Sequence, residues 1–156
     1  MAGEFHHATC LRLGAHGVLL RGPSGSGKSD LALRLIRSTW AGELVADDQV
    51  LIEAEDGQLF ASAPVVLAGL IELRGLGMLQ MPYLARTLLH LAVDLVPRDD
   101  VPRMPDPAAL RLCGLELPRI VLHAFDASAP DKLGLAAKLI PARGFAGEDG
   151  IIGCCD

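Results

Sequence analysis

The sequence predicts an α/β domain built around a phosphate-binding loop. Residues 22–29 read Gly-Pro-Ser-Gly-Ser-Gly-Lys-Ser and match the pattern G-x-x-x-x-G-K-[S/T] at every required position. Residues 18–20 form an apolar run before this segment, and residues 30–38 follow it with apolar side chains at i and i+4. The run is typical of a buried strand and the spacing of a helix. The order of elements is therefore strand, glycine-rich loop and helix.

This loop predicts a nucleoside triphosphate site. Glycines allow successive backbone N–H groups to approach a polyphosphate, and the N-terminus of the following helix adds its positive dipole end. In this motif the side chain of Lys28 reaches the β- and γ-phosphates, and the hydroxyl of Ser29 binds Mg²⁺. The residues expected to bind the nucleotide are Gly22, Pro23, Ser24, Gly25, Ser26, Gly27, Lys28 and Ser29.

The composition indicates one domain over residues 1–156, with a frayed tail from about residue 141 that includes Cys154 and Cys155. A hydrophobic content of 51% is ample for a single core. The formal charge of −5 and the absence of a basic run argue against nucleic acid and anionic membranes as partners. Apolar stretches are shorter than the ~20 residues of a membrane span, and the N-terminus lacks signal-peptide features. We therefore expect a cytoplasmic protein without a membrane segment.

The remaining elements follow from short apolar runs and turn signals. Ser128 is expected to cap a final helix, with Pro130 in its first turn. The Asp-Gly pair at residues 56–57 predicts a hairpin turn. Four prolines predict a surface loop over residues 97–107. The expected strands cover residues 8–13, 18–20, 44–46, 50–52, 58–61, 70–74 and 88–96, with a closing pair over 110–117 and 119–122.

Two adjacent carboxylates, Asp47 and Asp48, follow the expected strand at residues 44–46. Carboxylates at the end of an apolar strand are costly unless a positive group or a metal ion meets them. Enzymes that use Mg²⁺-nucleotides hold the metal with such an acid on a strand near the phosphate loop. The alternative is a polar turn between two strands; beside a phosphate loop, the functional interpretation is favoured.

Three blocks together carry a resemblance to a known family. They are residues 17–29, residues 44–48 with the sequence Leu-Val-Ala-Asp-Asp, and residues 71–78 with the sequence Ile-Glu-Leu-Arg-Gly-Leu-Gly-Met. On these blocks the chain resembles the C-terminal catalytic domain of HPr kinase/phosphorylase, over about residues 7–122, and we expect a short form without the separate N-terminal domain. The resemblance implies a strongly curved mixed sheet around the phosphate loop, as in phosphoenolpyruvate carboxykinase.

The resemblance also implies an activity and roles for single residues. The family uses ATP and Mg²⁺ to phosphorylate a serine of HPr, the phosphocarrier protein of the phosphotransferase system, and a homo-oligomer is possible. Lys28 matches the phosphate-loop lysine and Ser29 the Mg²⁺-binding serine. The other implied residues are Asp47 as proton acceptor, Asp48 and Glu72 as metal-associated carboxylates, His7 as a nearby histidine that holds or relays the proton, and Arg103 as an arginine for the phosphate.

One segment departs from the family pattern. The family has an Arg-Pro-Gly-Arg-Asn-like loop that is tied to the reverse, phosphorolytic reaction, whereas this chain reads His-Ala-Phe-Asp-Ala-Ser at residues 123–128. We therefore expect weak or absent phosphorylase activity.

Two other functions remain open at this point. The loop sequence also resembles that of guanylate kinase, which favours a small-molecule or nucleotide kinase, but such enzymes bind the acceptor nucleotide with arginines and tyrosines and this chain has only Tyr83. A nucleotide-binding sensor without catalysis would need the loop but no proton acceptor. A GTPase is disfavoured because the chain contains no asparagine for an Asn-Lys-x-Asp motif.

Overall fold

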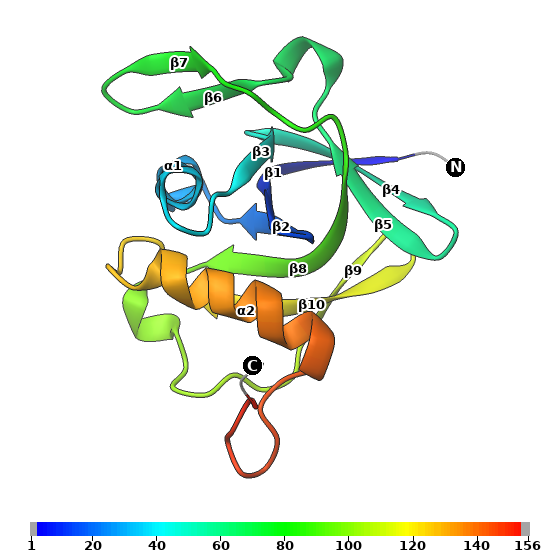
Figure 1. The fold of residues 1–156 in the computed structure, drawn as a ribbon, viewed down its shortest axis with the longest axis vertical. Coiled ribbons are helices and arrows are strands. Elements are labelled where there is room, and N and C mark those ends of the chain that lie inside the picture. The colour runs from blue at the N-terminus through cyan, green and yellow to red at the C-terminus, as the bar shows by residue number, and fades with distance from the viewer. Residues whose placement is uncertain (1–2, 154–156) are drawn as a thin grey trace.

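The computed structural model describes residues 3–153 and has a mixed α/β fold (Figure 1). Two helices pack on one side of a curved sheet, and a small separate hairpin stands beside them. Within the described residues the elements are β1 (Glu4–Leu13), β2 (His16–Arg21), α1 (Lys28–Arg37), β3 (Glu43–Ala46), β4 (Gln49–Glu55), β5 (Gln58–Ser62), η1 (Val65–Leu67), β6 (Leu70–Leu73), β7 (Gly77–Gln80), β8 (Thr87–Leu95), η2 (Arg98–Asp100), β9 (Ala109–Leu112), β10 (Leu115–Leu122) and α2 (Ala129–Arg143).

The main sheet curves until it closes on itself. Strands β2, β1, β4, β5 and β8 pair in that order, and β2 also pairs with β8, so these strands form a ring; β10 and β9 extend it beyond β8. Strand β8 runs parallel to both β2 and β10, whereas β1 is antiparallel to β2. The carboxyl ends of β2, β8 and β10 therefore meet at one edge, which is where ligands bind in such sheets. The predicted mixed, curved sheet is confirmed.

The two carboxylates at Asp47 and Asp48 interrupt a continuous strand pairing. Strand β3 pairs with one half of β1, with Cys10 opposite Ala46, and β4 pairs with the other half, with His7 opposite Gln49. Between these registers Asp48 adopts a left-handed backbone conformation with φ of 69°. Aspartate tolerates this region better than most residues. Because of this irregularity, the two adjacent side chains leave the strand in different directions.

Apolar side chains fill both faces of the main sheet. Helices α1 and α2 cover one face, where Leu31 and Leu133 are fully buried with Leu20 of β2. On the opposite face Leu19, the neighbour of Leu20 on β2, packs with Ala92 of β8 in a second cluster inside the curve of the sheet. Adjacent residues of a strand point to opposite faces, so β2 contributes to both layers and is held rigidly on each side.

Most expected elements are confirmed, including the hairpin turn at Asp56-Gly57 and the exposed proline-rich loop. The C-terminal expectations need correction. Ser128 precedes α2, but its side chain makes no capping hydrogen bond. The helix continues through Pro141 to Arg143, and Phe145 beyond it packs against the core, so the chain stays ordered past residue 141. Cys154 and Cys155 lie outside the described residues.

No helix within residues 3–153 is long and apolar enough to cross a bilayer.

Candidate active site

Residues 22–29, here called the phosphate loop after their predicted ligand, connect β2 to α1. Gly27 precedes the helix with φ of 97°, a conformation that favours glycine, and its carbonyl accepts the hydrogen bond from Leu31 N–H at 2.9 Å. Lys28 is the first helical residue, and its Nζ donates to the carbonyl oxygens of Gly22 at 2.6 Å and Pro23 at 3.2 Å. The ammonium group is therefore held over the loop.

Lys28 is buried, with 8% of its surface exposed. Desolvation lowers the pKa of Lys28, and the charges of Asp47 and Asp48 oppose this shift. Across residues 3–153, no carboxylate lies within ion-pair distance of the Lys28 ammonium. A partly desolvated cation without a direct counter-ion suits a bound anion, because the anion supplies the missing charge.

Asp47 connects the phosphate loop to three other elements. Its carboxylate accepts hydrogen bonds from Ser29 Oγ at 2.9 and 3.2 Å, from Thr9 Oγ1 at 2.8 Å and from the backbone N–H of Glu72 at 3.1 Å. These donors lie on α1, β1 and β6, and Asp47 itself follows β3. The residue is 6% exposed. Both of its carboxylate oxygens are thus already engaged below the surface of the site.

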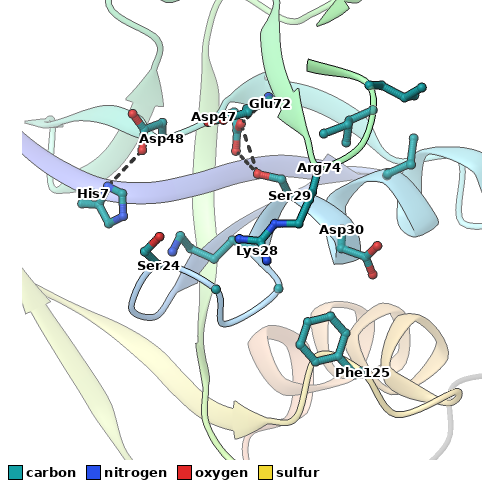
Figure 2. A pocket seen from close by; sticks show the side chains of 15 residues that line it. His7, Ser24, Lys28, Ser29, Asp30, Asp47, Asp48, Glu72, Arg74 and Phe125 are labelled. Carbon is teal, nitrogen blue, oxygen red and sulfur yellow. Dashed lines mark hydrogen bonds and ion pairs between the residues drawn. The ribbon is translucent and has the colours of Figure 1, made fainter. Parts of the chain in front are cut away.

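Asp48 faces a different partner. Its Oδ1 lies 3.1 Å from Nδ1 of His7, and both side chains are more than half exposed, at 67% and 55%. His7 is on β1, and Figure 2 shows the Asp48–His7 pair to one side of the Asp47–Ser29 contact, in the same pocket. The family resemblance implied Asp47 as proton acceptor and Asp48 as a metal-associated carboxylate. In the structure it is Asp47 that is buried against Ser29, whereas Asp48 forms an open pair with His7.

A pocket of about 500 Å³ joins these groups. Most predicted site residues line this pocket. Besides the residues described above, they include Ser24, Gly25 and the side chain of Glu72. Gly22, Pro23 and Ser26 do not line it and form the base of the loop.

Arg103 is also not among the lining residues, which corrects the expectation that it reaches the site. It is exposed in the proline-rich loop after η2. That loop is tied down through Arg98, whose Nε lies 2.6 Å from Asp126.

The pocket contains two residues that sequence reasoning did not select. Arg74 lines it from the end of β6, and Phe125 lines it from the segment after β10. Arg74 stands two residues after Glu72, and side chains at i and i+2 of a strand share a face. The alternating pattern in the sequence could therefore have predicted that Arg74 lies in the pocket with Glu72. For Phe125 there was no such signal, because its proximity depends on β10 lying beside β8 in the sheet.

Oxygen donors suitable for a metal ion gather at the pocket wall. Ser29, Asp47 and Glu72 all line it, whereas Asp48 is drawn toward His7. Between residues 3 and 153, no three His, Cys, Asp or Glu side chains form a ready-made metal cage. An open, all-oxygen set fits Mg²⁺, which is bound in such sites by one or two carboxylates and completes its coordination with water and substrate phosphates.

Comparisons with known proteins show which family and which fold this chain is similar to. The family model described as HPr Serine kinase C-terminal domain matches residues 2–88. The HPr kinase/phosphorylase of Clostridium tetani is 47% identical over 68 residues, which cover 44% of this chain and 22% of that protein. The HPr kinase/phosphorylase of Geobacillus thermodenitrificans is 36% identical over 118 residues, 68% of this chain and 38% of that protein. The matched stretches thus span well under half the length of these relatives.

The fold resembles a solved structure over most of both chains. The HPr(Ser) kinase/phosphatase from Coxiella burnetii superimposes with a TM-score of 0.74 and 28% sequence identity, covering 84% of this chain and 91% of that one.

Proposed function

This chain belongs to the family of the HPr serine kinase C-terminal domain, and we propose that it transfers the γ-phosphoryl group of ATP to a serine of an HPr-type phosphocarrier protein. The observation that carries this proposal is the pair of acids at the loop: one is tied to the phosphate-loop serine, and the other faces the open pocket beside a histidine. A sensor without catalysis would have no need of the second acid.

The triphosphate is held by the loop and two cations. Backbone N–H groups of the phosphate loop and the Lys28 ammonium face the β- and γ-phosphates. Arg74 lines the same pocket, and none of its neighbours among the described residues forms an ion pair with it. Phosphoryl transfer is accelerated mainly by positioning and by stabilising charge on the transferred group. We therefore propose that Arg74, rather than Arg103, stabilises the charge on the transferred phosphoryl group.

The metal-binding residues in this proposal are Ser29, Asp47 and Glu72. Bound Mg²⁺ would neutralise charge on the β- and γ-phosphate oxygens. The Ser29 hydroxyl donates its proton to Asp47 at 2.9 Å, which leaves its oxygen lone pairs available as a ligand. Asp47 orients that hydroxyl from below, and Glu72 is exposed in the pocket beside it.

The proton acceptor is assigned to Asp48 with His7. The serine oxygen of the carrier attacks the γ-phosphorus, the bond from that phosphorus to the β–γ bridging oxygen breaks, ADP leaves, and the hydroxyl proton passes to the Asp48 carboxylate. Asp47 is poorly placed for this role because it is only 6% exposed and lies beneath the Ser29 hydroxyl, where an incoming serine side chain does not reach it. Asp48 is exposed to an incoming side chain, and His7 at 3.1 Å can hold the proton afterwards.

Phosphorolysis is proposed to be weak or absent. The segment after β10 presents Phe125 to the pocket and lacks arginine between residues 123 and 128. Arg98, from the adjacent loop, is already paired with Asp126. Among the described residues that line the pocket, the lysine and arginine side chains are Lys28 and Arg74, which this proposal already assigns to the nucleotide.

The test is phosphoserine formation on an HPr-type carrier, followed by mass spectrometry after incubation with Mg²⁺-ATP. Asp48→Asn should lower the transfer rate by about 100-fold, the usual lower range for loss of a general base, while ATP binding is retained. Asp47→Asn should weaken Mg²⁺-ATP binding itself. Asp56→Asn is the matched control, because Asp56 also has positive φ, at 52°, and lies in the β4–β5 turn. Full transfer by Asp48→Asn, or no transfer by the wild type, would contradict the proposal.

A further inference from the structure

The pocket also has apolar lining residues that the proposed phosphoryl-transfer chemistry does not use. Leu33, Leu76 and Phe125 line it together with the acids and the phosphate loop. The Phe125 side chain is 55% exposed and Leu76 is 73% exposed. In Figure 2 the Phe125 ring and the carboxylates of Asp47 and Asp48 lie on opposite sides of the phosphate loop. One pocket thus has both charged and apolar lining residues.

Phe125 is held against the loop by packing. A Cβ atom on Gly27 would lie 2.9 Å from the Phe125 ring and 2.7 Å from the Ala124 side chain. The ring of His123 meets the Phe125 ring edge to face, with centroids 5.8 Å apart. The aromatic ring therefore lies directly beside Gly27, the residue that precedes α1, and glycine at this position makes the close approach possible.

The segment that carries Phe125 is also fixed at its backbone. The guanidinium of Arg34, on α1, donates to the carbonyl oxygens of Ala124 and Asp126. His123 Nδ1 lies 3.0 Å from the carbonyl oxygen of Val96. An exposed aromatic ring on a braced segment is preorganised for a ligand, because little conformational entropy is lost when the ligand binds.

The strand order determines which part of a nucleotide can reach this ring. The phosphate loop follows β2 and the Phe125 segment follows β10, and both strands run parallel to β8 between them. The acids instead come from other elements: Asp47 and Asp48 follow β3, which is antiparallel to β1, and Glu72 lies on β6 of the separate hairpin. If the terminal phosphate lies at Ser29 and Asp47, the ribose and base can extend along the carboxyl ends of β8 and β10, where Phe125 lies.

On this geometry we propose that Phe125 is the stacking platform for the base of a purine nucleotide. The inference rests on the proposed function, since it places the base relative to a phosphate tail in the loop. Stacking on an aromatic face tolerates any base, so the site accepts adenine and guanine nucleotides alike. The ring selects nucleotides over bare polyphosphates.

The experiment compares ADP, GDP and tripolyphosphate, each with Mg²⁺, by calorimetric titration of the full chain. Phe125→Leu, which keeps an apolar side chain, should weaken ADP and GDP binding by about tenfold or more and leave tripolyphosphate binding unchanged. Phe125→Trp should restore nucleotide binding. Phe60→Leu is the control: Phe60 lies on β5 under the Arg86 guanidinium, outside the pocket, and its loss should change none of the three affinities.

The outcomes separate the base site from the phosphate site. Equal loss of ADP and tripolyphosphate binding in Phe125→Leu, or no loss of either, would overturn the stacking role while leaving the phosphate loop as the anion site. Failure of the wild type to bind any of the three ligands would overturn the proposed function and the base site together.

Discussion

The hydrogen bond from Thr9 to Asp47 predicts a measurable loss of stability when the threonine is changed to valine. Thr9 is fully buried on β1, and its hydroxyl donates to Asp47 Oδ1 at 2.8 Å. Valine has nearly the same shape, so the change removes the donor without opening a cavity. Hydrogen bonds to charged groups contribute about 1.5–3 kcal/mol. We therefore expect Thr9→Val to lower the free energy of unfolding by about 2 kcal/mol.

The measurement is urea denaturation, with the slope of free energy against denaturant held common to all variants. Thr87→Val is the matched control, because Thr87 is also buried but its hydroxyl reaches only the neighbouring Leu88 carbonyl, at 3.2 Å. Thr87→Val should lower the free energy of unfolding by less than about 1 kcal/mol, because this hydrogen bond joins two uncharged groups. In a double-mutant cycle, Thr9→Val and Asp47→Asn should couple by about 1 kcal/mol. Equal effects of the two threonine variants together with zero coupling would refute the assigned role of Asp47 as a shared acceptor.

Two further predictions concern the pocket arginine and a partly buried histidine. Arg74→Gln should lower the rate of phosphoserine formation at least about tenfold, while its unfolding free energy stays within about 0.5 kcal/mol of wild type. Arg103→Gln should match wild type in the same transfer assay. If Arg103→Gln lost activity and Arg74→Gln did not, Arg103 rather than Arg74 would be assigned to the site. His90 Nδ1 accepts a hydrogen bond from Gly17 N–H at 3.2 Å, and burial, with a smaller contribution from His16, lowers the pKa of His90. Because the unfolded chain then binds the proton more readily, the unfolding free energy should fall as the pH drops below about 6.5. Denaturation at several pH values should show a smaller fall of the unfolding free energy in His90→Asn than in the wild type. An identical dependence of unfolding free energy on pH in the two proteins would contradict this explanation.

The local geometry of the site followed directly from residue type and spacing. The phosphate-loop motif and its flanking periodicity predicted the strand, the turn and the helix, and these are found as β2, residues 22–29 and α1. The apolar run before Asp47 correctly placed an acid at the end of a neighbouring strand. Such features depend on backbone conformations and side-chain periods of a few residues, so they can be read without knowing what packs against them.

The misplaced details all involve residues far apart in the chain. Arg103 was expected in the site from the family resemblance, but it is exposed in a loop whose residues do not line the pocket. The sequence did not predict that Asp47 contacts Ser29 and Asp48 contacts His7, since the divergence of these acids depends on the irregular pairing of β3 and β4 with β1. Thr9 and Phe125 gave no local signal at all.

The sequence by itself determined that the chain has a phosphate-binding loop between a strand and a helix, with acids on a nearby strand. Only the tertiary structure decided which acid meets Ser29, which meets His7, and which arginine and aromatic ring complete the pocket. The physical reason is that strand register and sheet order are set by the packing of both sheet faces at once. A one-residue change in register would turn every side chain of β1 to the other face, so contacts across the sheet are a property of the whole core.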